Sequence, residues 1–169
     1  MGAGFVTGCL VAEPLSFAHE AELAALHSDE RVMAMMGGRT ATAEESRAWL
    51  ERNLKHGAEP GLGVFVFREQ STGRFVGRGA IRPIEIGGRA EVEVGYAVVA
   101  ELWGRGLATE MASALVDHAS AHGLADLVAY TEPANAASRR VMEKAGFSYE
   151  RDVDHHGRPQ VLYRLVRTS

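Results

Sequence analysis

The strongest constraint on the fold is a change in the spacing of apolar residues near position 63. Before it, three segments carry apolar residues at helical spacing: 17–27, 29–36 and 42–57. After it come three segments rich in β-branched and aromatic residues, joined by short turns: 63–69, 75–84 and 89–99. Three successive strands on short turns predict an antiparallel meander that follows a helical N-terminal part.

Local signals mark the start of the chain's first elements. Segment 10–15 is short and apolar and contains Pro14, which indicates a strand at the edge of the sheet. Ser16 stands at the N-cap position of the first helix. Thr42 and Glu45 form a T-x-x-E capping box that opens the third helix.

The second half of the chain alternates helices and strands. We expect a long helix over 106–122, a strand over 126–131 and a helix over 135–146, followed by a closing hairpin of 147–153 and 159–166. Strand 126–131 is apolar almost throughout, which indicates burial on both faces. Together the elements predict a mixed α/β fold in a single domain spanning 1–169.

Composition and charge exclude several classes of protein. The net charge of −4 and the lack of a basic tail argue against a nucleic-acid partner. No apolar run approaches the roughly 18 residues needed to span a bilayer, and no basic segment precedes the first apolar residues as in a signal peptide. The single Cys9 permits no intramolecular disulfide and no zinc site. We therefore expect a cytoplasmic protein without a metal or a membrane segment.

The turn Gly104-Arg105-Gly106 precedes the long helix and indicates either an anion site or only a tight turn that packs the helix on a strand. The first N–H groups of a helix have no partner within the helix, and the helix dipole places about half a positive charge there. Glycine lets a phosphate approach the backbone, and Arg105 adds a full charge. The turn lacks the Lys-Ser or Lys-Thr of a Walker loop, and Thr109 stands where the dinucleotide fingerprint needs its third glycine.

Three sequence motifs make the chain resemble the GNAT superfamily of N-acetyltransferases, in its branch of ribosomal-protein N-terminal acetyltransferases. The central motif of that family is [QR]-x-x-G-x-[GA], and Gly106 and Ala108 match it, with Trp103 in place of Gln or Arg. The strand motif is present as A-E-V-E-V-G-Y at 90–96. The helix motif N-x-x-[SA], followed by K-x-G-F, is matched by Asn135, Ser138, Lys144, Gly146 and Phe147.

The resemblance implies the fold and the donor. It implies a mixed, mostly antiparallel sheet, splayed between strands 90–99 and 126–131 and flanked by four or five helices, with acetyl-CoA in the splay. The pyrophosphate is then expected on the backbone of a turn and the first helical turn, at Trp103, Gly104, Arg105, Gly106, Leu107, Ala108 and Thr109. The pantetheine arm is expected along Ala97, Val98 and Val99, with Asn135 donating to it.

Acetyl transfer to an amine needs a base, a group that stabilises the oxyanion and a way to protonate the leaving thiolate. Glu93 is the candidate base, directly or through water, and Glu91 on the same strand face is the alternative. The oxyanion donor is expected to be a backbone N–H near Tyr96 or Ala97. Ser138 is the candidate proton donor, because Met142 stands where many members of the family carry a tyrosine.

Other side chains have a possible role and a plainer structural one. Arg139 or Arg140 could reach the 3′-phosphate of CoA, and Arg39 could bind an acidic group of the acceptor. Residues that could border the acceptor, but that also suit packing or a solvated turn, are Met33, Met35, Met36, His155 and His156. His118 lies on the apolar side of the long helix and is expected to pack rather than react.

The resulting prediction is an acetyl-CoA-dependent N-acetyltransferase that works by direct transfer in a ternary complex. The acceptor is a primary amine: a protein N-terminus, an antibiotic or a small metabolite. Two alternatives remain open, an acyl-CoA-binding regulator without turnover and a transferase of a larger acyl group such as succinyl. A basic residue facing the thioester would favour the larger acyl group. The resemblance also favours a homodimer.

Overall fold

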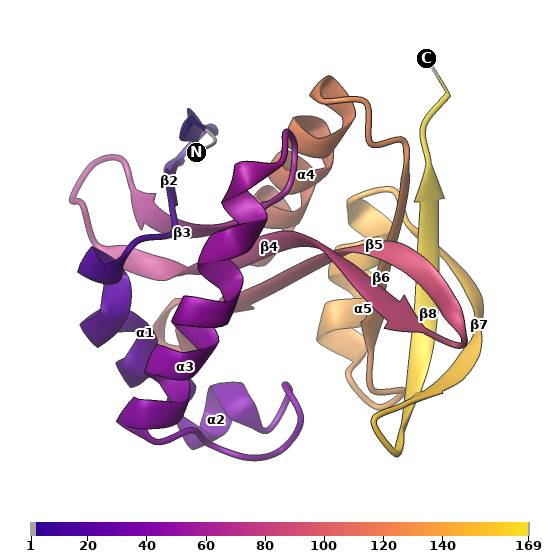
Figure 1. Cartoon of the computed structure of the whole chain (residues 1–169), viewed down its shortest axis with the longest axis horizontal. Helices are drawn as coiled ribbons and strands as arrows, with labels where there is room; N and C mark the ends of the chain where they lie inside the picture. Colours follow the sequence, from indigo (N-terminus) through magenta and orange to yellow (C-terminus); the bar gives the residue numbers. More distant parts are fainter. Residues whose placement is uncertain (1–2, 169) are drawn as a thin grey trace.

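Within residues 3–168, which the computed structural model describes, eight strands form one sheet with helices on both faces (Figure 1). The strands are β1 (Phe5–Val6), β2 (Leu10–Pro14), β3 (Gly63–Glu69), β4 (Phe75–Ile86), β5 (Arg89–Val98), β6 (Asp126–Thr131), β7 (Ser148–His155) and β8 (Arg158–Val166). The α-helices are α1 (Glu20–His27), α2 (Glu30–Met33), α3 (Ala43–Leu54), α4 (Leu107–Ala121) and α5 (Ala136–Lys144). Short 3₁₀ turns cover Phe17–His19, Lys55–Ala58 and Ala100–Leu102. In this part of the chain no helix is both long and apolar enough to cross a bilayer.

The sheet is splayed at its centre, as the resemblance implied. Its strand order is β1-β2-β3-β4-β5-β6-β8-β7, and every neighbouring pair is antiparallel except β5 and β6. Those two strands run parallel and share a single residue pair, Glu93 with Val128. They diverge beyond that pair, which opens a gap in the sheet next to Glu93.

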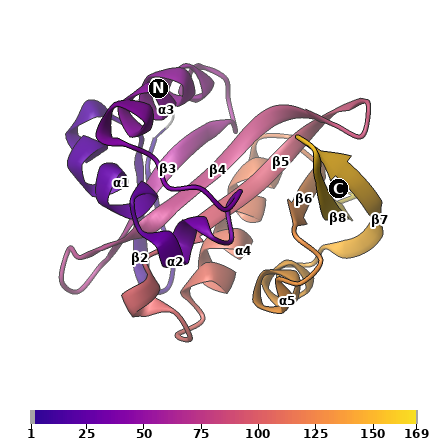
Figure 2. The ribbon, with the colours of Figure 1, turned by 90° about the horizontal axis from the view of Figure 1, so that it is seen from below.

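Helices cover both faces of the sheet (Figure 2), and an apolar cluster on each face holds them to it. On one face, Leu23 of α1 and Leu50 of α3 pack on Val66 of β3. On the other face, Met111 and Leu115 of α4 lie in the largest cluster, which continues to β6 and β8. Burying each such side chain contributes about 1.5–3 kcal/mol. The first face carries Glu93 and therefore positions the site.

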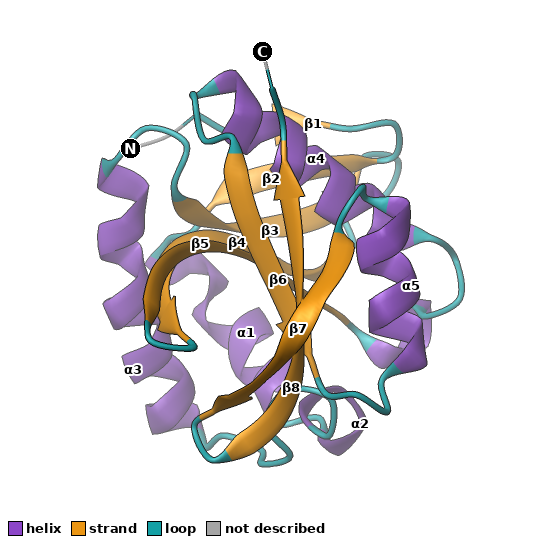
Figure 3. Ribbon diagram, turned by 90° about the vertical axis from the view of Figure 1, so that its right-hand side faces the viewer, coloured by secondary structure: helices purple, strands orange, loops and turns teal. Residues whose placement is uncertain are grey.

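Two-residue turns set the register of both long hairpins (Figure 3). Gly87-Gly88 joins β4 to β5, and His156-Gly157 joins β7 to β8. His156 has a φ of 51°, which the left-handed turn between twisted strands requires. The predicted meander and the predicted closing hairpin are both confirmed.

The structure differs from the sequence prediction at three places. Segment 10–15 is not the edge strand, because β1 pairs outside β2 and Phe5 packs edge-on against Phe65 with ring centroids 5.1 Å apart. The helix expected over 29–36 is shortened to α2, and the first helix begins as a 3₁₀ turn. Of the T-x-x-E capping box only one half forms: Thr42 Oγ1 accepts from the Glu45 N–H (3.1 Å).

The missing half of the capping box has a local cause. The Glu45 carboxylate accepts a hydrogen bond from Arg39 Nη2 at 2.5 Å, which draws it away from the N-cap backbone. An ion pair with a residue outside the helix has replaced the reciprocal bond.

Candidate active site

A cleft of about 860 Å³ opens at the splay. Its walls come from α2 and α3, from β4 and β5, from the turn before α4, from α5 and from the β7–β8 hairpin. The predicted donor-site residues that line it are Ala97, Val98, Trp103, Gly104, Gly106, Leu107, Ala108, Thr109, Asn135 and Ser138. Val99 and Arg105 do not line it, and Arg105 is exposed beside its mouth.

The turn before α4 is shaped to receive an anion. Gly104 and Gly106 have φ values of 81° and 74°, a conformation that a side-chain-bearing residue rarely adopts, and the space above both is open. No side chain caps α4, and its first helical bond runs from the Glu110 N–H to the Gly106 carbonyl (3.1 Å). The N–H groups of Leu107 to Thr109 therefore precede the helical ladder and stay available at the cleft.

The register of β4 and β5 decides which backbone groups face the splay. The Val99 N–H donates to the Val76 carbonyl (2.9 Å), and alternate residues of an antiparallel pair share such bonds. The backbone groups of Ala97 and Val99 are thus directed to β4, while those of Tyr96 and Val98 are directed to the splay. Trp103 Nε1 donates to the Val98 carbonyl (2.9 Å), which leaves the N–H groups of Tyr96 and Val98 for a ligand.

Glu93 lies in the cleft at the point where β5 and β6 diverge. Its side chain is 9% exposed, and Oε2 accepts from Arg82 Nε at 3.0 Å. Arg82 also donates from Nη1 to Asn53 Oδ1 (2.9 Å), so the guanidinium is anchored to α3. Oε1 of Glu93 lies above Gly95, whose missing side chain leaves room for it.

The alternative base, Glu91, is held elsewhere. Its carboxylate accepts from Arg164 at 2.7 and 3.0 Å, and it does not line the cleft. These hydrogen bonds from Arg164 hold the pKa of Glu91 below its usual range. Arg164 also pairs with Glu150 and Asp126. The geometry therefore favours Glu93 over Glu91.

Ser138 lies at the first turn of α5 and contacts Tyr96 of β5. The two hydroxyl oxygens are 3.0 Å apart, and the Tyr96 hydroxyl also donates to the Ser138 carbonyl (3.2 Å). Burial raises the pKa of Tyr96 to about 12, so the phenol stays protonated. Asn135 Oδ1 accepts from the Ser138 N–H and its amide donates to Thr131 Oγ1, each at 3.1 Å, which fixes the start of α5.

The other candidates divide between the cleft and the scaffold. Those that line the cleft are Met33, Met35, Met36, Arg39, Arg140, His155 and His156. Arg139 does not, since it donates to the Tyr163 hydroxyl (3.0 Å) and to the Pro133 carbonyl (2.9 Å). Met142 is buried in the core and also lines the cleft with one side. Among residues 3–168 no three His, Cys, Asp or Glu side chains gather in a way that could hold a metal ion.

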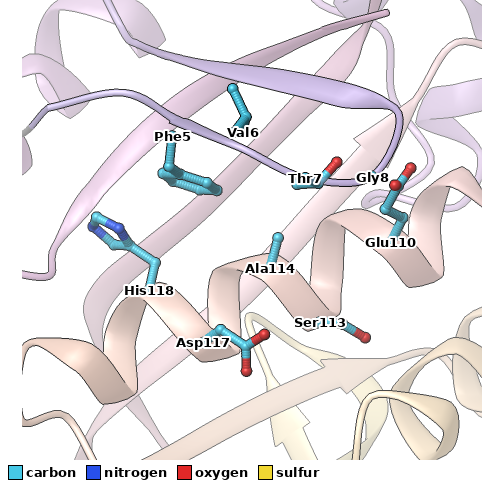
Figure 4. A pocket seen from close by; sticks show the side chains of 9 residues that line it. All are labelled: Phe5, Val6, Thr7, Gly8, Glu110, Ser113, Ala114, Asp117 and His118. Carbon is cyan, nitrogen blue, oxygen red and sulfur yellow. The ribbon is translucent and has the colours of Figure 1, made fainter. Parts of the chain in front are cut away.

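His118 packs in a smaller hollow of about 480 Å³ between β1 and α4 (Figure 4). Its ring stacks on Phe5 at 4.8 Å and meets Phe65 edge-on at 5.2 Å. Burial lowers the pKa of His118, and the residues around the hollow include neither Glu93 nor Ser138. His118 therefore packs against aromatic side chains outside the cleft, as expected.

The comparison with protein families decides the identity. Residues 10–148 match the family described as "Acetyltransferase (GNAT) domain". The chain belongs to the GNAT acetyltransferase family. It is an acetyl-CoA-dependent N-acetyltransferase.

Relatives of this GNAT chain include "Uncharacterized protein YkkB" of Bacillus subtilis (strain 168), which is 29% identical over 82% of this chain and 80% of its own length. The acetyltransferase from Agrobacterium tumefaciens str. C58 superposes with a TM-score of 0.84 at 24% identity, over 99% of this chain and 96% of its own. RimL, a ribosomal L7/L12 alpha-N-protein acetyltransferase in complex with coenzyme A, superposes with a TM-score of 0.79 at 17% identity, over 96% of each chain. The two structural likenesses show the fold.

The GNAT site also contains residues that the sequence interpretation missed. Arg82 and Arg78 on β4, Trp49 on α3 and Tyr130 on β6 all line the cleft. The two arginines had a signal. Counting outward from the Gly87-Gly88 turn places Arg82 opposite Glu93 and Arg78 opposite Ala97, as observed. Trp49 and Tyr130 had none, since only the packing of α3 and the splay brings them to the site.

Proposed function

We propose that the chain transfers an acetyl group from acetyl-CoA to a primary amine by direct attack within a ternary complex. The observation that carries this proposal is that Glu93 and Ser138 line one cleft, which also contains the turn and helix start suited to the pyrophosphate. Protein N-termini, antibiotics and small metabolites all supply such an amine. Bound acetyl-CoA supplies an activated acetyl thioester.

The donor's contacts would come from three elements. The N–H groups from Gly104 to Thr109 would bind the pyrophosphate, helped by the dipole of α4, whereas the Trp103 N–H already donates to the Ala100 carbonyl (3.2 Å). The Val98 N–H would bind the pantetheine arm as an added strand does, and Asn135 would do so after giving up its bond to Thr131. Arg105 and Arg140 are placed at the turn and on the cleft wall to meet the phosphates.

Glu93 would remove the proton from the attacking ammonium. Its Oε2 is occupied by Arg82, so Oε1 is the oxygen left to accept the proton, directly or through one water. The Tyr96 N–H faces the splay and would stabilise negative charge on the thioester oxygen. The hydrogen bond from Arg82 would hold the Glu93 carboxylate in place.

Ser138 would give a proton to the departing thiolate. Its hydroxyl contacts the Tyr96 hydroxyl at 3.0 Å, which would hold the serine oxygen in place, and the serine would regain its proton from solvent.

Initial-rate kinetics with two varied substrates test the proposal. Thiol release is followed while acetyl-CoA and a primary amine are each varied. Direct transfer gives lines that intersect in a double-reciprocal plot, because both substrates are bound before reaction. Parallel lines would indicate an acyl-enzyme and contradict the proposal. Cys9, the free cysteine, lies outside the cleft and offers no nucleophile to it.

Location and assembly remain predictions. We infer a cytoplasmic protein that acts as one domain and pairs as a homodimer. Sedimentation velocity measures the last of these, with a dimer expected at micromolar concentration.

A further inference from the structure

Within residues 3–168, one guanidinium of the cleft is buried without an anionic partner. Arg78 on β4 is 5% exposed and lines the cleft. Among residues 3–168 no carboxylate pairs with it. Its hydrogen bonds run from Nε to His27 Nε2 (3.0 Å) and from Nη2 to Met36 Sδ (3.9 Å). A buried charge is normally paired, because leaving water costs several kcal/mol per ion.

The surroundings hold Arg78 in one orientation. Its guanidinium lies over the ring of Trp49, 4.4 Å from the centroid. His27 Nδ1 is 2.8 Å from Ser46 Oγ, so the ring donates there and presents Nε2 to Arg78. Burial lowers the pKa of His27 to about 3, so the ring is neutral and adds no charge of either sign.

The carboxylate whose charge acts on Arg78 is already in use. Glu93 is bound by Arg82, and the two guanidiniums with one carboxylate leave one positive charge on this wall of the cleft. Burial lowers the pKa of Arg78 to about 9, which still leaves it charged at neutral pH.

The free end of Arg78 opens onto the cleft. Its Nη1 makes no hydrogen bond within the described residues. In that part of the chain, the only fully buried side-chain nitrogen or oxygen without a hydrogen-bond partner is Ser120 Oγ. Arg78 Nη1 also lacks a partner, so it must be accessible to solvent. An oriented, buried cation with an accessible donor is a binding group for an anion.

We propose that Arg78 binds a carboxylate carried by a substrate, next to Glu93, and that the acceptor amine is the substrate that carries it. This inference rests on the proposed transfer and specifies its substrate class. The acyl chain of a dicarboxylic thioester is the other source of the same group. Arg39 is a weaker anchor for the carboxylate, because it is exposed and already paired with Glu45.

The first experiment compares matched acceptor amines. Thiol release from acetyl-CoA is compared for amines that differ only in a carboxylate or a primary carboxamide, such as β-alanine and β-alaninamide, or aspartyl and asparaginyl dipeptides. The carboxylate member is expected to have the higher kcat/KM. In Arg78→Met the ratio of kcat/KM for the carboxylate acceptor to that for the carboxamide acceptor is expected to fall by about 10- to 100-fold. The fall is expected chiefly through a higher KM for the carboxylate acceptor.

A second arm separates the two sources. Succinyl-CoA and acetyl-CoA are compared with a carboxamide acceptor. If the carboxylate belongs to the acyl chain, succinyl-CoA is preferred and Arg78→Met abolishes that preference. This outcome would keep Arg78 as a carboxylate site but overturn its assignment to the acceptor.

The control is Arg52→Met, which removes a positive charge from an exposed position on the same cleft. It is expected to change the preference by less than about threefold, because solvent and salt screen exposed charges. A readout without turnover accompanies both variants. Removing a buried unpaired cation is expected to raise the Tm of the free protein in Arg78→Met, whereas a merely structural arginine would lower it.

The proposal is overturned if neither substrate pair is distinguished, or if Arg78→Met keeps the preference. In both cases the carboxamide amines are still acetylated, so the proposed function stands. Absence of thiol release with every amine would instead contradict the proposed function.

Discussion

Arg82 donates from Nε to Oε2 of Glu93 across 3.0 Å, at the point where the sheet divides. The pair leaves one carboxylate oxygen free in the cleft and anchors the other to α3 through Asn53. A general base must lie within hydrogen-bond reach of the proton that it removes, and Glu93 is oriented at the splay by this pair.

Glu93→Gln is expected to lower kcat by about 10²- to 10⁴-fold, the usual contribution of a general base. Acetyl-CoA affinity is expected to be unchanged, because the donor contacts lie on other residues. Thiol release measures the first and isothermal titration the second.

Glu91→Gln is the matched control. It is expected to keep kcat within a few-fold and to lower the free energy of unfolding by about 1–3 kcal/mol, since it removes a charged acceptor of Arg164. If Glu91→Gln lost activity and Glu93→Gln kept it, the assignment of the base would be reversed.

Gly95→Ala is expected to disturb the base without touching it chemically. A Cβ at this position would lie 3.1 Å from Glu93 Oε1, so the carboxylate must shift by a few tenths of an ångström. We expect kcat to fall about 3- to 10-fold, since misplacing a catalytic group by 1 Å costs about 100-fold. An unchanged kcat would show that the position of Oε1 is not critical.

Gly106→Ala is expected to weaken acetyl-CoA binding. Its Cβ would meet open space, so the cost comes from the φ of 74°, about 1–2 kcal/mol. A local change of the turn would also misalign the N–H groups of α4. Gly123→Ala, at the far end of the same helix with a φ of 84° and equally open space, is the matched control. Titration of both variants is expected to show weaker binding for Gly106→Ala alone, and equal weakening would remove the turn from the donor site.

The pKa of His27 predicts how stability depends on pH. Burial and repulsion by Arg78 lower the pKa in the folded protein to about 3, from 6.5. The unfolded chain therefore binds a proton that the folded chain does not, and stability falls as the pH drops below 6.5 toward 3. Between pH 6.5 and 5 this histidine contributes a loss of about 2 kcal/mol. Urea unfolding at both pH values measures it.

His27→Gln supplies the comparison for that slope, because glutamine cannot take up the proton but can still bond to Arg78 and Ser46. The variant is expected to lose less stability than the parent protein between pH 6.5 and 5. Equal slopes in the two proteins would mean that His27 is protonated in the folded state.

Much of the fold was readable because its signals are local. The alternation in 89–99, the two-residue turns and the glycines before α4 each fix a nearby backbone conformation. β1 was missed because its pairing depends on Phe5 reaching Phe65 and Phe67, which are distant in sequence. The α2 helix was predicted too long because apolar spacing does not show where a helix gives way to a turn.

The site was readable only in part for the same reason. Motif residues such as Gly106 and Ser138 identify themselves by spacing. Glu93 and Glu91 differ in the arginine that each contacts. Arg82 of β4 pairs with Glu93 and Arg164 of β8 pairs with Glu91, and these pairings depend on how the strands are arranged in the sheet. Within the described part of the chain Arg78 has no carboxylate partner. This arrangement depends on how α1, α3 and β4 pack together and has no local sequence signal.

The most direct test of the account is thermal melting with acetyl-CoA at about a hundred times its dissociation constant. Binding to the folded chain is then expected to add about 2.7 kcal/mol, or roughly 5–10 °C in Tm for a domain of this size. A shift of that size supports the cleft at the splay as the donor site. No shift with acetyl-CoA, succinyl-CoA or free CoA would contradict the central claim.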